Sequence, residues 1–227
     1  MVDHLNPGGP VSNSIKRLFL LPAMFCWMVL SACGISQGTS EPLRLFVLDI
    51  EEGREVRDMS PPSRPMNLPS LLVSLPQPAP GFESQRMAYE QVPHALQYFA
   101  TSQWVDSPAR MLAPLITNAL ETGEDWASVI QLPSVIRGDY RLDLSQVALV
   151  QEFTQQPSRI RLTLRAQLMT VYDPHVIGTR SFEFREEAPS EDAYGGVQAA
   201  HNAVRRLLGD LKEWLHNILQ ARQLAHD

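Results

Sequence analysis

Cysteine is nearly absent from this chain of 227 residues, which contains only Cys26 and Cys33. Cys26 lies inside an apolar N-terminal leader, and Cys33 stands at the end of that leader. The rest of the chain therefore has no cysteine pair for a disulfide and no thiol for catalysis. Its stability must therefore come from packing alone. An excess of basic residues is also missing, because the formal net charge is -6. That mild acidity argues against a nucleic-acid-binding role.

The chain also lacks the short motifs that carry common catalytic and cofactor chemistry. It has no Gly-x-Ser-x-Gly, no P-loop and no Gly-x-Gly-x-x-Gly. No two histidines stand at metal-ligand spacing, and His201 and His216 are too far apart on one predicted helix to share an ion. Gly195-Gly196 is interpreted as loosening the start of that helix rather than cradling phosphate. We therefore predict no catalytic residue, no metal and no cofactor; a hydrolase that uses two carboxylates remains an alternative.

The most specific segment is the apolar stretch that ends at Cys33. Lys16 and Arg17 precede an apolar run from Leu18 to Leu30, and Leu30-Ser31-Ala32-Cys33 fits the bacterial lipobox. At helical rise the run spans about 20 Å, which is short of the roughly 30 Å of membrane hydrocarbon. A signal peptide that is cleaved before an acylated cysteine is therefore favoured over a transmembrane anchor.

This lipobox predicts the compartment and the first boundaries of the chain. Residues 1–32 form the signal peptide, and residues 33–42 form a lipidated, flexible tether of small polar residues. We expect Cys33 to carry the acyl chains, including palmitate. Because Gly34 rather than an aspartate follows the cysteine, the expected location is the periplasmic face of the outer membrane.

Period-two and helical patterns predict a single domain over residues 43–222. Strands are expected at 43–50, 71–75, 86–91, 96–101, 126–132, 139–153, 159–172 and 176–187, and helices at 108–121 and 194–220. Ser107 is the expected N-cap of the first helix, with Pro108 at its first position. Residues 51–64 are interpreted as an exposed loop. The predicted fold class is α/β (α+β), a mostly antiparallel sheet with two helices packed on it.

The last three strands are the clearest part of the pattern. In Arg159–Tyr172 the apolar residues alternate with arginine, threonine and glutamine, which predicts one core face and one wet face. In the strand before it the alternation changes phase near Ser145 and Gln146, which predicts a β-bulge. These strands are expected to form an antiparallel meander.

Two groups of side chains allow both a structural and a functional interpretation. Arg161 and Arg165, with Arg159, form either a solvated face compensated by Glu152 and Glu183, or a basic surface for an acidic partner or a lipid headgroup. The aromatic residues fill the core or line a groove for an aromatic ligand. This second group comprises Tyr89, Tyr98, Phe99 and Trp104.

Several short motifs, in this order, resemble those of the ABC-type transport auxiliary lipoproteins. They are the lipobox, Ser84-x-Arg86-Met87-x-Tyr89, Leu96-x-Tyr98-Phe99, Gln103-Trp104-x-Asp106-x-Pro108-Ala109-Arg110-Met111-Leu112, Arg141-Leu142-Asp143 and Ser190-Glu191-Asp192-x-Tyr194-Gly195-Gly196. The resemblance covers roughly residues 43–219. One departure is Phe46-x-Leu48, where family members often have Tyr-x-Leu.

The resemblance implies a non-enzymatic auxiliary component of a transporter that moves lipids or other hydrophobic molecules between the two membranes. The implied partners are a mammalian-cell-entry (MCE) domain protein with its inner-membrane permease and ATPase, the outer membrane through the acyl anchor, and identical copies in a ring. Contact candidates for a partner or ligand are Arg86, Tyr89, Tyr98, Trp104, Asp106, Arg110, Arg161 and Arg165. The alternative is an envelope-assembly scaffold lipoprotein that binds another outer-membrane protein.

Overall fold

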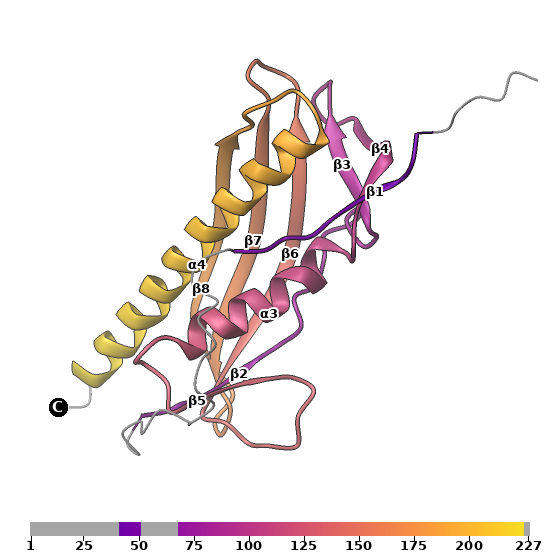
Figure 1. Cartoon of the computed structure of the whole chain (residues 1–227). Helices are drawn as coiled ribbons and strands as arrows, with labels where there is room; N and C mark the ends of the chain where they lie inside the picture. The colour runs from indigo at the N-terminus through magenta and orange to yellow at the C-terminus, as the bar shows by residue number, and fades with distance from the viewer. Residues whose placement is uncertain (1–40, 51–67, 225–227) are drawn as a thin grey trace, which may run out of the picture. The chain divides into compact units, whose positions relative to one another are not determined.

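The computed structural model describes residues 41–50 and 68–224 (Figure 1). The chain divides into two units, Met1–Glu41 and Pro42–Asp227, and every helix and strand below belongs to the second unit. The predictions for the signal peptide, Cys33, the tether and the loop at 51–64 lie outside the described residues.

The predicted antiparallel meander forms the larger part of the sheet. It consists of β6 (Tyr140–Glu152), β7 (Arg159–Thr170) and β8 (Val176–Glu187), paired in sequence order. The predicted bulge is confirmed, because the β6–β7 register shifts between Ser145 and Ala148. Gln146 adopts a left-handed φ of 56° at this point.

The sheet is mixed, so the prediction of a mostly antiparallel sheet is wrong. On the edge of β6 that does not pair with β7 lie two short strands, one after the other: β2 (Ser70–Val73) and β3 (Arg86–Glu90). Both run parallel to β6. The segment between them continues this pairing, since the Ala79 N–H donates to the Val147 carbonyl oxygen at 2.9 Å. Alternation in the sequence indicates which face of the sheet a residue occupies. It does not indicate whether the neighbouring strand runs parallel or antiparallel, so it could not predict this arrangement.

The sheet therefore forks at β6. Beyond β3 lies β4 (Leu96–Trp104), antiparallel to β3 as predicted, and then β1 (Arg44–Phe46), parallel to β4. Beyond β2 lies β5 (Ser128–Gln131), also parallel. Strand β1 is shorter than the predicted strand at 43–50, and β5 is shorter than the one predicted at 126–132.

Both predicted helices are present. Helix α3 (Pro108–Glu121) begins after Ser107, and helix α4 (Ala193–Leu224) extends beyond the predicted end at Gln220. The two helices lie on the same side of the meander (Figure 1). The fold is thus a single α+β domain.

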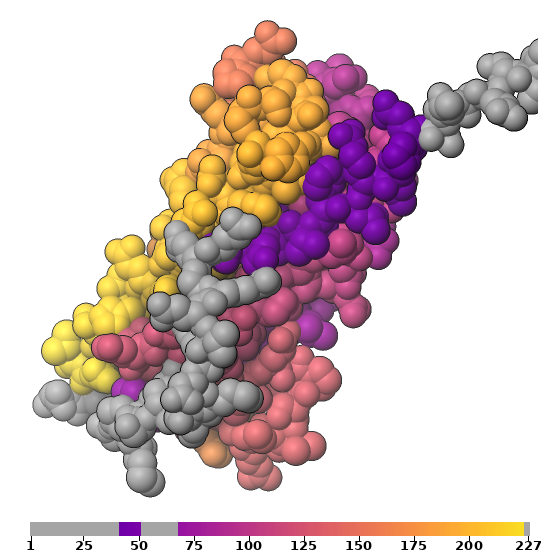
Figure 2. Space-filling model, in the orientation of Figure 1, coloured from indigo at the N-terminus to yellow at the C-terminus, as the bar shows by residue number. Residues whose placement is uncertain are grey.

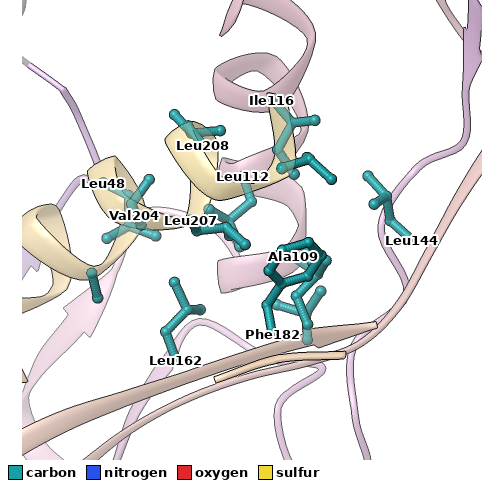
Figure 3. Close-up of a cluster of buried hydrophobic side chains, with 14 of the residues drawn as sticks. Leu48, Ala109, Leu112, Ile116, Leu144, Leu162, Phe182, Val204, Leu207 and Leu208 are labelled. Carbon is teal, nitrogen blue, oxygen red and sulfur yellow. The ribbon is translucent and has the colours of Figure 1, made fainter. Parts of the chain in front are cut away.

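One hydrophobic core joins the two helices to the sheet. Figure 3 shows Leu112 and Ile116 of α3 and Leu207 of α4 near Leu144 of β6 and Leu162 of β7. All five side chains are buried, and the alternating apolar residues of β7 from Ile160 to Leu168 belong to this core. The opposite face of β7 carries the arginines, as the alternation predicted.

The start of α4 is held by local hydrogen bonds. Asp192 precedes the helix, and its Oδ1 accepts the Gly195 N–H at 2.8 Å and the Ser190 hydroxyl at 2.7 Å. The hydrogen bond from Gly195 is the main reason that the pKa of Asp192 lies below its ordinary value. A β-carbon on Gly195 would lie 2.2 Å from the Ser190 carbonyl oxygen. The two glycines thus allow close packing, which replaces the interpretation that they loosen the helix.

Candidate functional site

The predicted contact residues belong to three separate parts of the fold. Arg86, Tyr89 and Tyr98 belong to the neighbouring strands β3 and β4. The segment from Trp104 to Arg110 joins β4 to α3, and Arg161 and Arg165 lie on the outer face of β7.

A hollow opens at the end of β3, β4 and β6 that is nearest to the start of α4. We call it the aromatic hollow; its volume is about 640 Å³, and it is lined by Tyr89, Gln91, Tyr98, Phe99, Ala100, Phe153, Gln155, Gln156 and Glu191. Three rings form its apolar part: the Tyr89 and Phe99 centroids are 4.8 Å apart, and Phe153 lies 6.0 Å from Tyr89. The rest of its lining consists of three glutamines, the Glu191 carboxyl group, Tyr98 and Ala100.

Sequence reasoning found Tyr89 and Phe99 but missed Phe153. This ring follows β6 directly, and the Phe153 N–H donates to the Glu90 carbonyl oxygen at 2.8 Å. The parallel pairing of β3 with β6, with Tyr89 opposite Gln151, brings Phe153 to Tyr89. The only signal in the sequence is an aromatic residue at the end of a predicted strand, which does not reveal its neighbour.

Tyr98 belongs to the opposite face of the sheet from Tyr89. In the β3–β4 register Tyr98 pairs with Ala88, whereas Tyr89 pairs with Gln97. The Arg86 guanidinium carbon lies 3.8 Å from the centroid of the Tyr98 ring, a cation–π contact. The Tyr98 hydroxyl donates to the Gly81 carbonyl oxygen at 2.8 Å. Arg86 is thus held as an exposed cation over a fixed ring.

Trp104 lies in the core. Its side chain is only 1% exposed, so the structural interpretation of this ring is the one that the fold supports. The exposed groups of its segment are instead Asp106 and Arg110. Asp106 accepts the Ser107 N–H at 2.7 Å through Oδ1 and the Arg110 Nε–H at 2.9 Å through Oδ2. The carboxylate therefore stabilises the first turn of α3 and orients Arg110.

The arginines of the outer face differ in their surroundings. Arg161 donates from Nε to Oε1 of Glu152 at 2.5 Å, and its guanidinium lies 3.6 Å from Glu90. Glu183 pairs with Arg185 rather than with Arg161. In the described part of the chain Arg165 has no ion-pair partner. The predicted compensation by Glu152 is therefore present at Arg161 and does not extend to Arg165.

The histidines make isolated contacts. His216 Nδ1 lies 2.6 Å from Asp125 Oδ1, and His201 Nε2 lies 3.1 Å from the Val47 carbonyl oxygen. Within residues 41–50 and 68–224, no three histidine, cysteine, aspartate or glutamate side chains come together in a way that could hold a metal ion. Over the same ranges, no helix has the length and apolar character needed to cross a membrane.

Comparison with known proteins connects this fold to a family. The sequence model for the ABC-type transport auxiliary lipoprotein component matches residues 54–211. A crystal structure of a protein from Xanthomonas campestris is similar to this chain with a TM-score of 0.64 and 22% identity, covering 81% of this chain and 99% of the other. The structure of an uncharacterized protein gives a TM-score of 0.57 with 9% identity, covering 77% of this chain and 99% of the other. No functionally curated protein matches the sequence.

Proposed function

Because this chain belongs to the family of ABC-type transport auxiliary lipoprotein components, we propose that it is the outer-membrane component of an MCE-type ABC transport system. In this role it is non-catalytic and docks an MCE-domain protein, which works with an inner-membrane permease and ATPase. The cargo is a lipid or another hydrophobic molecule. The observation that carries the proposal is the family match over residues 54–211.

The anchor in this proposal is the acylated Cys33. The lipobox Leu30-Ser31-Ala32-Cys33 supports it. Each buried methylene of an acyl chain adds about 0.8 kcal/mol of membrane affinity, so several chains hold the protein at the membrane durably. Gly34 at the following position supports sorting to the periplasmic face of the outer membrane. The tether then keeps the domain close to the lipid, where it can meet a partner that crosses the periplasm.

The docking surface in this proposal is the aromatic hollow. Tyr89, Phe99 and Phe153 are half-buried, so they are held by packing and still reachable from outside. Half-buried aromatic rings surrounded by polar groups are typical of interface positions that contribute most to binding. Gln91 and Glu191 supply hydrogen-bonding groups beside the rings. A protein partner that inserts an apolar side chain fits this lining.

Co-purification tests the proposal. We expect the detergent-extracted, acylated protein to recover the MCE-domain protein, and a Cys33→Ala variant to be lost from the outer-membrane fraction. Filling the hollow with Ala100→Trp should abolish the recovery, since Ala100 is exposed and lines the hollow. The matched control is Tyr172→Trp, at an exposed aromatic residue in the β7–β8 turn, which should leave recovery unchanged.

The identity of the recovered partner and the oligomeric state of the protein test the proposal further. Recovery of a different outer-membrane protein without any MCE-domain protein would contradict the transport role and favour an assembly scaffold. Native mass spectrometry of the extracted protein tests the proposed ring of identical subunits. A ring would present several aromatic hollows to one partner, and a monomeric mass would contradict it.

A further inference from the structure

An exposed apolar strip runs along β1 at one edge of the sheet. It consists of Leu43, Leu45 and Val47 of the segment around β1 and Val105 after β4, with exposed fractions of 52%, 57%, 51% and 41%. The first three alternate along an extended segment and so point to one side. Leu45 pairs with Gln103, and the Val105 N–H donates to the Phe46 carbonyl oxygen at 2.9 Å, which places Val105 beside Val47. We call these four residues the β1 strip.

No other described strand covers the β1 strip. Strand β1 pairs with β4 alone and stands at the end of the strand order. Figure 2 shows the indigo segment 41–50 at the surface of the domain. Exposed apolar residues on the free edge of a sheet are a feature that soluble proteins normally avoid, which makes this strip a candidate interaction surface.

Cationic side chains lie next to the strip. Leu45, Gln103 and Arg86 stand in one row across β1, β4 and β3, so Arg86 shares the face of Leu45. Arg110, in the first turn of α3, follows Val105 by five residues in the chain; its side chain is 73% exposed and its Nε lies 2.9 Å from Oδ2 of Asp106. Apolar residues with arginines beside them match a membrane interface, where the apolar side chains enter the acyl region and the guanidinium groups meet phosphate.

The covalent chain places this strip near lipid. Only residues 34–42 of the tether separate the predicted acylation site, Cys33, from Leu43. Even fully extended, ten residues span at most about 36 Å. The strip is therefore the first part of the described domain that follows the anchor, and the anchor raises its effective concentration at the bilayer surface.

We propose that the β1 strip rests on the lipid leaflet that holds the acyl anchor, with Arg86 and Arg110 at the anionic headgroups. This inference rests on the proposed acylation of Cys33. Contact along the β1 strip orients the domain on the membrane, which a flexible tether alone does not do. The Tyr89 and Phe99 rings of the aromatic hollow lie on the other face of β3 and β4 from Arg86, so this part of the hollow stays available to a protein partner.

Site-specific fluorescence tests this orientation. With Cys26 removed in the leader and Cys33 acylated, an introduced cysteine is the only free thiol. The full acylated protein is labelled with an environment-sensitive dye at Leu45→Cys and reconstituted into vesicles of phosphatidylethanolamine and phosphatidylglycerol. We expect a blue shift and strong quenching by a lipid-borne quencher. The control Arg44→Cys should be quenched several-fold less, because successive residues of a strand face opposite sides and Arg44 is the neighbour of Leu45 in β1.

Quenching compared among several labelled positions gives a second test that does not depend on one variant. Labels at positions 43, 45 and 47 should be quenched, and a label at the fully exposed Val135 in the β5–β6 loop should stay in water. Equal quenching at positions 44, 45 and 135, in protein whose acylation is established by intact mass, would overturn the inference and leave the anchor standing. Burial of position 45 that appears only at many protein copies per vesicle would also overturn it, because a second copy would then cover the strip. A mass without acyl chains would overturn the proposed anchor itself.

Discussion

Gly196 at the start of α4 lies directly against the side chain of Gln151 on β6. A β-carbon at Gly196 would stand 2.3 Å from Oε1 of Gln151, a distance that real contacts do not reach. Gln151 is 1% exposed, and its Nε2 donates to the Ser158 hydroxyl at 3.0 Å and to the Asp192 carbonyl oxygen at 3.2 Å. One amide group thus joins the sheet, the turn after β6 and the start of the helix.

We expect Gly196→Ala to destabilise the protein. The added methyl must displace the buried Gln151 amide, and forcing extra atoms into a packed site costs about 1–3 kcal/mol. Chemical denaturation of the two proteins measures this difference. Gly209→Ala is the matched control, because a β-carbon there meets nothing within 4 Å. In an exposed helix interior that change should raise the free energy of unfolding by about 0.5–1 kcal/mol. Equal effects at the two glycines would contradict the close contact.

The carboxylate of Asp192 should make α4 sensitive to acid. Its pKa is lowered in the folded protein, first by the hydrogen bond from the Gly195 N–H and then by the one from Ser190. A lowered pKa means that the stabilisation is complete above the unfolded pKa of about 3.9 and is lost as the pH falls through the folded pKa. Asp192→Asn keeps a capping side chain without the charge. The wild type should therefore be more stable than this variant at pH 7, and the difference should vanish in strong acid.

Replacing the same residue by alanine separates the cap from the charge. Asp192→Ala should cost about 0.5–2 kcal/mol at pH 7, the usual effect of losing an N-cap side chain. Thermal unfolding followed by circular dichroism at 222 nm, the usual helix signal, measures it. If alanine and asparagine variants have the same stability at pH 7, the Asp192 side chain does not cap α4.

Arg161 should matter more for stability than Arg165. It lies between Glu90 and Glu152, whose side chains are only 16% and 15% exposed. Arg161→Met removes the cation beside Glu90 and leaves Glu152 with Arg185, whose Nε lies 3.6 Å from its Oε2. Because the site is partly solvated, we expect a loss of about 1–3 kcal/mol, below that of a fully buried pair. Adding Glu90→Gln should recover part of the loss. Arg165→Met, at a residue with no ion pair in the described chain, should change the free energy of unfolding by less than about 0.5 kcal/mol.

Trp104 should behave as a core residue rather than as a contact. Trp104→Ala removes a side chain that is 1% exposed, and truncating such a residue costs about 3–5 kcal/mol. Arg110→Ala, at the exposed end of the same segment, should cost less than about 1 kcal/mol. Urea denaturation separates the two expectations. If Trp104→Ala lowered the free energy of unfolding only slightly but abolished partner recovery, Trp104 would be a contact residue rather than a core residue.

Much of the architecture could be predicted because it depends on local periodicity. The alternation in β7, the apolar stripe of α4 and the phase change at Gln146 each depend on residues close together in the chain. The candidate site was predicted less well. Tyr89 and Phe99 were found as aromatic residues on strands, but Phe153 and Glu191 join them only through strand pairing and the position of α4.

The sequence by itself determined the lipobox, the core face of each long strand, the two helices and the absence of common catalytic motifs, since each depends on residue type at short spacing. Only the tertiary structure decided that β2 and β3 share one edge of β6 in parallel, that Tyr98 and Tyr89 face opposite sides, and that the β1 strip is left uncovered. The physical reason is that side-chain alternation specifies the face of the sheet on which a residue lies, but not which strand pairs with its own. Strand direction and edge position come from hydrogen bonds between segments far apart in the chain.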